Sequence, residues 1–254
     1  MSSFKVAFAV LGFISIQLVE GSFKIYNGRR LTDWHENPFK FVVMLYGDAT
    51  CSGSLLDTST VLSAGHCFMS KTHYLDKVGL EHTIRGEVAK KVEIKQVYMQ
   101  KQYIDNFNKY SVDGLDVSVV KLQSKVSMTD NDVALLSLKL DSLPPVGTIV
   151  TMVGYGKDGK RKEKSRHLKT GRAELVSCSS PRLPNEPLCL EPKEQFSNRR
   201  AQHGDSGGPA VIQENGKYVG LGVVSGFDVL EHTRIVIVYA SVKRNAKFIM
   251  QHLH

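Results

Sequence analysis

The sequence predicts an all-β fold that ends in one α-helix. Short runs rich in valine and isoleucine recur along the chain, separated by turn-forming residues, as is typical of antiparallel strands. The clearest runs are 41–45, 60–63, 92–98, 149–153, 218–224 and 235–239. Only the tail at 243–253 has helical spacing, with Ala246, Ile249, Met250 and Leu253 expected on one apolar face.

Length and charge set the outer bounds of the fold. At 254 residues the chain can bury a large core, either as one unit of two barrels or as two domains. The formal net charge is +8, and we find no internal repeat and no low-complexity segment.

The N-terminus has the pattern of a processing signal. Lys5 precedes the apolar run 6–19, and Glu20 and Gly21 follow it. The run is short for a bilayer span, so a secretory leader is favoured over a membrane anchor. We expect a signal peptide at 1–21, cut after Gly21 or else after Ser22, and a secreted, extracellular protein.

The most informative motif is the heptapeptide at 203–209, His-Gly-Asp-Ser-Gly-Gly-Pro. Glycines let the backbone bend so that amide N–H groups converge beside the hydroxyl of Ser206. A hydroxyl next to converging N–H donors is what acyl transfer requires, namely a nucleophile and a site for the developing oxyanion. A glycine-rich turn without a catalytic role is the alternative.

A histidine that could serve as the base lies upstream in the segment 62–67, Leu-Ser-Ala-Gly-His-Cys. Histidine titrates in the range that a general base needs. Of the nine histidines, others such as His82, His167 and His232 lie in charged or loop-like surroundings. His66 follows an apolar run and precedes a cysteine that can hold its loop, which makes it the best candidate.

Together, the segments 64–67 (Ala-Gly-His-Cys) and 204–209 (Gly-Asp-Ser-Gly-Gly-Pro) resemble the chymotrypsin-like (trypsin-fold) serine endopeptidases. The resemblance extends from Ile25 to the C-terminus, and the two motifs occur in the family's order, about 140 residues apart. It implies two six-stranded antiparallel β-barrels with a C-terminal α-helix, and a peptidase domain at 25–254.

Two segments resemble the strand that follows the family's catalytic aspartate, one starting at Asp116 and one containing Asp132. The family has nearly forty residues between this aspartate and a Gly-aromatic-Gly strand. The Gly-Tyr-Gly sequence at 154–156 begins 38 residues after Asp116 but only 22 after Asp132. We therefore assign Asp116 and expect Asp132 to face solvent at the boundary between a loop and a strand.

The resemblance implies a role for each of these residues. Ser206 attacks the scissile carbonyl, His66 takes and returns the proton, and Asp116 orients His66. The N–H groups of Gly204 and Ser206 form the oxyanion hole.

The resemblance also implies activation by a cut after Lys24. Residues 22–24 would be a short activation propeptide, and the new ammonium of Ile25 would pair with Asp205. A trypsin-like protease, or the protein itself, would make this cut. Tyr26 and Asn27 depart from the residues usual at these positions.

Four cysteines permit three connectivities, and export permits disulfides. The resemblance implies pairs between Cys51 and Cys67, which would close the His66 loop, and between Cys178 and Cys189.

Two further bridges that are usual in the family are absent. Val150 and Ile212 occupy the positions of one, so an apolar pair replaces a cystine. Gln202 and Leu230 occupy those of the other, which normally braces the substrate pocket. This loss suggests a looser or reshaped pocket.

The predicted substrate pocket departs most from the family. Arg200 stands at the floor, where trypsin-like members have aspartate. The wall begins at Ser225, and Phe227 and Ile237 replace two glycines that normally admit a long side chain. Arg200 disfavours cleavage after lysine or arginine because like charges repel. Three outcomes stay open: an acidic substrate residue bound by Arg200, a small or medium apolar residue, or a blocked pocket with vestigial activity.

A basic segment at 157–169 holds seven Lys or Arg against two acids. It is either a solvated, cleavable loop or a docking site for an anionic partner such as a sulfated glycan, an anionic membrane surface or an acidic protein. Nucleic acid is disfavoured because aromatic residues are not interleaved. We expect no metal, no cofactor, no membrane span and a monomer.

Two functions of different class follow from these observations. The first is a secreted serine endopeptidase with non-tryptic specificity, acting on proteins or peptides. The second is a catalytically weak or inactive homologue that serves as a binding protein, decoy or cofactor.

Overall fold

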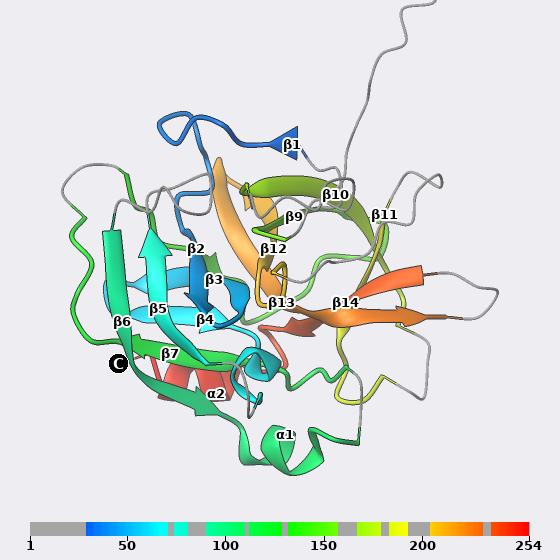
Figure 1. The fold of residues 1–254 in the computed structure, drawn as a ribbon. Coiled ribbons are helices and arrows are strands. Elements are labelled where there is room, and N and C mark those ends of the chain that lie inside the picture. Colours follow the sequence, from blue (N-terminus) through cyan, green and yellow to red (C-terminus); the bar gives the residue numbers. More distant parts are fainter. Residues whose placement is uncertain are drawn as a thin grey trace, which may run out of the picture.

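The computed structural model contains two β-barrels and a short C-terminal helix (Figure 1). It describes residues 29–70, 74–80, 90–109, 112–128, 132–156, 167–178, 183–192, 204–230 and 235–253. The expected leader at 1–21, the propeptide at 22–24, and Ile25, Arg200 and Gln202 lie outside these residues. So do positions 157–166 of the basic segment.

The first barrel closes in the order β2-β3-β4-β7-β6-β5. Its strands are β2 (Val42–Gly47), β3 (Thr50–Asp57), β4 (Thr60–Ser63), β5 (Leu75–Leu80), β6 (Lys90–Met99) and β7 (Ser118–Leu122). Its interior is filled by β-branched and leucine side chains such as Val43, Leu55, Val61, Val78 and Val120, all fully buried. Such side chains pack well on a pleated surface, which is why these runs form strands.

The second barrel follows the order β10-β11-β14-β13-β12-β9 and closes through the pairing of β10 with β9. Its strands are β9 (Ile149–Gly154), β10 (Lys169–Val176), β11 (Leu188–Pro192), β12 (Pro209–Glu214), β13 (Lys217–Val229) and β14 (Ile235–Ser241). All six pair in antiparallel fashion, as in the first barrel. Two short strands are added, β1 (Arg29–Arg30) beside β10 and β8 (Ser137–Leu138) beside β13. The predicted pair of six-stranded barrels is confirmed.

The described residues also form three short helical segments: η1 (Gly65–Phe68) and α1 (Lys101–Asn106), which connect strands of the first barrel, and α2 (Ala246–Gln251), which follows β14. The tail is helical as predicted, but its apolar face is rotated from the expected one. Ile249 is fully buried, whereas Met250 is 45% exposed. Phe248 instead packs with the cluster of Val119 and Ile249, which sets α2 beside β7 (Figure 1). None of the helices in the described ranges is long and apolar enough to cross a membrane.

The two barrels share apolar side chains where they meet. One shared cluster joins Met44 of β2 to Val153 of β9 and Val211 of β12, and another joins Leu62 of β4 to Val223 of β13. Side chains from both barrels are fully or almost fully buried there. Because this burial favours one relative placement, loops of one barrel are held against loops of the other.

Both predicted disulfides are present. The Cα atoms of Cys51 and Cys67 lie 6.4 Å apart, and those of Cys178 and Cys189 lie 5.3 Å apart. Val150 and Ile212 pack in one apolar cluster, as expected for a pair that replaces a cystine.

One expectation about the basic segment is wrong. The sequence predicts that Lys169 faces solvent with the other cations of this segment, but it begins β10 and is only 1% exposed. The strand pairs Lys169 with Gly154 of β9, which carries the residue into the second barrel.

Candidate active site

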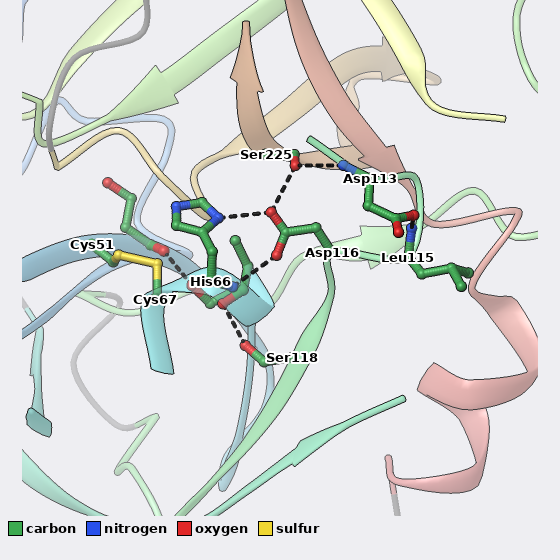
Figure 2. Close-up of polar contacts among 11 residues, drawn as sticks. Cys51, His66, Cys67, Asp113, Leu115, Asp116, Ser118 and Ser225 are labelled. Atoms are coloured by element: carbon green, nitrogen blue, oxygen red, sulfur yellow. Dashed lines mark hydrogen bonds and ion pairs between the residues drawn. A yellow bond between two sulfur atoms is a disulfide. The ribbon is translucent and has the colours of Figure 1, made fainter. Parts of the chain in front are cut away.

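His66 and Asp116 are in direct contact (Figure 2). His66 Nδ1 lies 2.7 Å from Asp116 Oδ2, and the His66 backbone N–H donates to Asp116 Oδ1 at 2.8 Å. The ring comes from η1, just after β4, and the carboxylate comes from the loop that precedes β7. Two contacts to one carboxylate fix both the position and the tautomer of the imidazole.

Ser225 of β13 makes the third contact to this carboxylate. Its hydroxyl donates to Asp116 Oδ2 at 2.7 Å, and the side chain is only 7% exposed (Figure 2). The sequence places Ser225 in the wall of the substrate pocket, so this hydrogen bond was not predicted. Asp116 of the first-barrel loop is thereby tied to a strand of the second barrel.

The contacts shift the titration of both groups in opposite directions. Burial alone would lower the pKa of His66, but the charge and hydrogen bond of Asp116 outweigh it and raise this pKa above its ordinary value. Burial alone would raise the pKa of Asp116, but the His66 charge and the hydrogen bonds from His66 and Ser225 hold it below its ordinary value. The carboxylate therefore stays ionised and favours an imidazolium beside it.

The loop before Asp116 is shaped by a second buried carboxylate. Asp113 Oδ1 accepts the Leu115 N–H at 2.8 Å and the Asn185 side-chain amide at 2.7 Å. The Asp116 N–H donates to the Asp113 carbonyl at 3.1 Å, closing a tight turn. Asn185 belongs to the segment before β11, so this turn is also anchored on the second barrel.

A buried tyrosine closes the other side of the carboxylate. A Cβ on Gly65 would lie 2.6 Å from Tyr103 Cε1 and 3.2 Å from Asp116 Oδ1, so only glycine leaves room for these neighbours. Burial, followed by the charge of Asp116, raises the pKa of Tyr103 far above its ordinary value, so its hydroxyl stays protonated. Neither Tyr103 nor Asp113 was singled out in the sequence.

Ser206 lies in a turn that the first barrel holds. Its carbonyl accepts the Ser52 N–H at 2.8 Å, and the Ser52 hydroxyl donates to the Gly204 carbonyl at 2.7 Å. At Gly207 φ is +76°, and a Cβ there would lie 2.1 Å from Ser63 Oγ. The turn therefore presses against the end of β4, from which η1 and His66 follow directly.

The N–H groups of this turn fall into two kinds. Those of Gly207 and Gly208 donate to the carbonyls of Val224 and Asp205, at 2.9 and 2.8 Å. Within the described part of the chain, those of Gly204 and Ser206 have no protein acceptor. A pair of such donors beside a hydroxyl can bind an oxyanion.

Asp205 is fully buried next to the Gly-Tyr-Gly strand end. Its Oδ1 accepts the Gly156 N–H at 2.7 Å, and a Cβ on Gly156 would lie 2.1 Å from Oδ2. The carboxylate thus requires glycine at 156, which gives a physical reason for the last residue of this motif.

The described part of the predicted pocket consists of three residues on β13 and β14. Phe227 and Ile237 are direct cross-strand partners, so their side chains lie on one face of the sheet. Ile237 is buried with the second barrel's apolar cluster, whereas Phe227 is 44% exposed. Ser225 contacts Asp116 instead of facing only the pocket.

Asp132 lies away from these groups. Its carboxylate is 3.9 Å from Lys40 Nζ and 3.6 Å from His35 Nδ1, and its side chain is 25% exposed. It is therefore half-buried with basic neighbours, where the sequence predicts a solvent-facing residue.

Among the described residues, one cluster of potential metal ligands meets a distance criterion. The ligand atoms of Cys51, His66 and Cys67 lie within 4.8 Å of one another. Both sulfurs belong to one disulfide, so neither offers the thiolate that binds a metal.

The missed residues share a weak signal. Ser52, Ser63 and Ser225 are polar residues inside apolar strands, and each is buried with a hydrogen bond. A serine in such a run must find a partner because an unpaired buried hydroxyl is costly. The sequence does not indicate which partner, since the Ser52 and Ser225 bonds cross between the barrels and the Ser63 bond joins two strands of the first barrel.

The comparisons with known proteins agree with this architecture. The family model described as Trypsin matches residues 28–249. A cercarial protease from Schistosoma mansoni is 32% identical over 243 residues, covering 86% of this chain and 87% of that protein. The thrombin-like enzyme agkihpin-1 and the snake venom serine protease pallabin-2, both from Gloydius halys, are 26% identical over 203 residues. Each covers 73% of this chain, and the alignments span 78% and 72% of those proteins. The chain belongs to the trypsin family of chymotrypsin-like serine proteases.

Proposed function

We propose that this protein is a secreted serine endopeptidase that hydrolyses peptide bonds through an acyl-enzyme. The observation that carries the proposal is the hydrogen-bonded chain from Ser225 through Asp116 to His66, beside the turn that holds Ser206. Membership in the trypsin family supports the same reaction.

Each step of the reaction uses one of these groups. Ser206 Oγ attacks the scissile carbonyl while His66 Nε2 accepts its proton. Asp116 keeps the other ring nitrogen protonated and stabilises the imidazolium that forms. The Gly204 and Ser206 N–H groups bind the oxyanion, and His66 then donates its proton to the leaving amine. Water repeats the sequence to release the acyl group.

Active-site labelling tests the proposal directly. A fluorophosphonate probe should modify one serine per molecule, and mass spectrometry should place it on Ser206. Ser206→Ala should abolish labelling and lower kcat for a peptide substrate by roughly 10⁶-fold. Ser142→Ala, at a partly exposed serine whose hydroxyl donates to the neighbouring Asp141, is the matched control. Equal turnover by wild type and Ser206→Ala would refute the assignment.

We further propose that the specificity is non-tryptic. Phe227 and Ile237 add bulk on one face of the pocket wall, and Arg200 adds a like charge for a basic substrate residue. A peptide library should therefore show little cleavage after lysine or arginine. Strong cleavage after either would contradict the assignment of the pocket.

A pair of variants tests which residue restricts the pocket. Phe227→Gly should widen the range of side chains accepted before the scissile bond, because it removes the exposed ring. Val229→Gly is the control, since Val229 is similarly exposed on the same strand, at 41%. If both variants keep the wild-type profile, Phe227 does not limit specificity.

The bulky pocket wall also favours a second candidate, a binding protein that cleaves weakly or not at all. The two candidates differ in one measurement. An endopeptidase reacts with the probe and turns over peptides, whereas a decoy can react with the probe but turns over none of a diverse library.

A further inference from the structure

A lysine is buried close to the active-site turn. Lys169 is 1% exposed, and its ammonium donates to the Gly156 carbonyl at 2.7 Å. Burying an ammonium is costly unless a counter-charge lies near it. The reaction proposed above gives this charge no role.

The buried carboxylate of Asp205 lies on the other side of the same residue. The Gly156 N–H donates to Asp205 Oδ1 at 2.7 Å, while the Gly156 carbonyl accepts from Lys169. The N and O atoms of one residue are less than about 4 Å apart, so these two hydrogen bonds place the ammonium nitrogen within about 9 Å of Asp205 Oδ1.

Strand register gives a second, independent sign of this proximity. Lys169 is the cross-strand partner of Gly154. A Cβ on Gly154 would lie 2.6 Å from Asp205 Oδ1. The Asp205 carboxylate therefore lies against two residues, Gly154 and Gly156, that Lys169 also contacts.

We propose that Lys169 is a positioning residue whose ammonium pairs with the Asp205 carboxylate and so holds the 204–208 turn in its oxyanion-binding form. Asp205 directly precedes Ser206, and its carbonyl accepts the Gly208 N–H at 2.8 Å. Fixing Asp205 thus fixes the hydroxyl and both N–H donors. An ammonium has three donors, so one can serve Gly156 and another the carboxylate.

The pairing has a consequence for activation. The sequence predicts that the Ile25 ammonium, released by a cut after Lys24, is the partner of Asp205. Lys169 supplies a cation that is present without any cut, so the uncut chain reacts at its serine. This consequence rests on the proposed endopeptidase function, whereas the pairing itself does not.

A double-mutant cycle tests the pair without relying on catalysis. Unfolding is measured for wild type, Lys169→Met, Asp205→Asn and the double variant. Methionine keeps most of the lysine's volume without its charge. Each single change should lower the free energy of unfolding. The double change should lower it by less than the sum of the two single effects, and the difference should correspond to about tenfold or more in the unfolding constant. Additive effects would overturn the proposal.

Labelling with the fluorophosphonate probe tests the consequence for the active site. Lys24→Gln keeps the chain uncut, which intact mass verifies, and a fusion can be cleaved to release a chain that starts at Ile25. The probe should label the uncut chain at a rate within about tenfold of its rate with the released chain. Adding Lys169→Met to the uncut chain should slow labelling about 100-fold or more, the scale of breaking a buried ion pair. The control is Lys121→Met, which removes a half-buried lysine that donates to the Thr60 hydroxyl, and it should not slow labelling.

The released chain separates charge from structure. In the released chain the Ile25 ammonium can replace the lost lysine charge. The released Lys169→Met chain should therefore be labelled at a rate within about tenfold of that of the released chain without this substitution. Persistent slow labelling would mean that the lysine only packs, and would overturn the proposal. An uncut chain that fails to label while the released chain labels would overturn it too. If the probe labels none of these chains but the double-mutant cycle shows coupling, the proposed endopeptidase function is wrong, while the proposed pairing of Lys169 with Asp205 is supported.

Discussion

Replacing Asp116 by asparagine tests the central geometry, because the variant can adopt only one amide orientation. The His66 N–H donates to Oδ1, whereas His66 Nδ1 and the Ser225 hydroxyl contact Oδ2. An amide nitrogen at the Oδ1 position would place two donors 2.8 Å apart. The NH₂ group therefore occupies the Oδ2 position, facing the ring of His66.

That orientation reverses the tautomer of the histidine. The amide donates to Nδ1, so the proton of a neutral ring moves to Nε2, where a base needs its lone pair. Asp116→Asn should lower kcat by roughly 10⁴-fold while leaving the fold intact. The loss should be in kcat more than in KM, because the carboxylate does not touch substrate.

The pH profile gives a second readout with a definite sign. In the wild type Asp116 raises the pKa of His66, so activity is lost as the pH falls through a value above the ordinary one of 6.5. In the variant only burial remains, and it lowers this pKa, so the acid limb should move to lower pH. Hydrolysis of an ester substrate from pH 4 to 9 would measure both effects. An unchanged kcat, or an acid limb at higher pH, would refute the reasoning.

Three further predictions concern Ser225, the turn at Gly207 and the basic segment. Ser225→Ala removes a hydrogen bond to an ionised carboxylate and should lower kcat about tenfold with little change in KM. Gly207→Ala should abolish probe labelling and lower the melting temperature, because a Cβ would lie 2.1 Å from a side-chain oxygen. Gly216→Ala has a similar φ of +77° but no atom within 4 Å, so it should keep its labelling. Neutralising Lys160, Arg161, Lys162 and Lys164 should lower the salt concentration that elutes the protein from heparin resin, with turnover of a small uncharged substrate unchanged; elution at the same salt would return the segment to a plain solvated loop.

The strands could be predicted because their pattern is local. Each predicted run overlaps a strand of the structure: 41–45 begins one residue before β2, the other runs lie within their strands, and β4 coincides with the predicted 60–63. The tail helix was also found, but its buried face was not. A short helix is positioned by the surface it packs on, and here Phe248 rather than Met250 meets that surface.

The candidate site was predictable only where spacing along the chain carries information. The distance to the Gly-Tyr-Gly strand separated Asp116 from Asp132, and the structure brings Asp116 against His66. The role of Ser225 was invisible because its bond to Asp116 spans 109 residues and both barrels. Lys169 was misplaced for a related reason: a charge run predicts solvent, and only the strand register reveals that its last member turns inward.

The arrangement of contacts implies that docking of the two barrels, more than the stability of either one, controls the site. The Asp116 carboxylate is held by His66 from one barrel and by Ser225 from the other. The turn that carries Ser206 belongs to the second barrel. Its Ser206 and Gly204 carbonyls accept hydrogen bonds from the backbone N–H and the hydroxyl of Ser52 in the first barrel. A small relative shift of the barrels would lengthen the bonds that cross between them, from Ser225 to Asp116 and from Ser52 to the Ser206 turn, while leaving each barrel's own ladder intact. Because general-base catalysis depends on sub-ångström placement of nucleophile and base, such a shift would cost far more in rate than in free energy of unfolding.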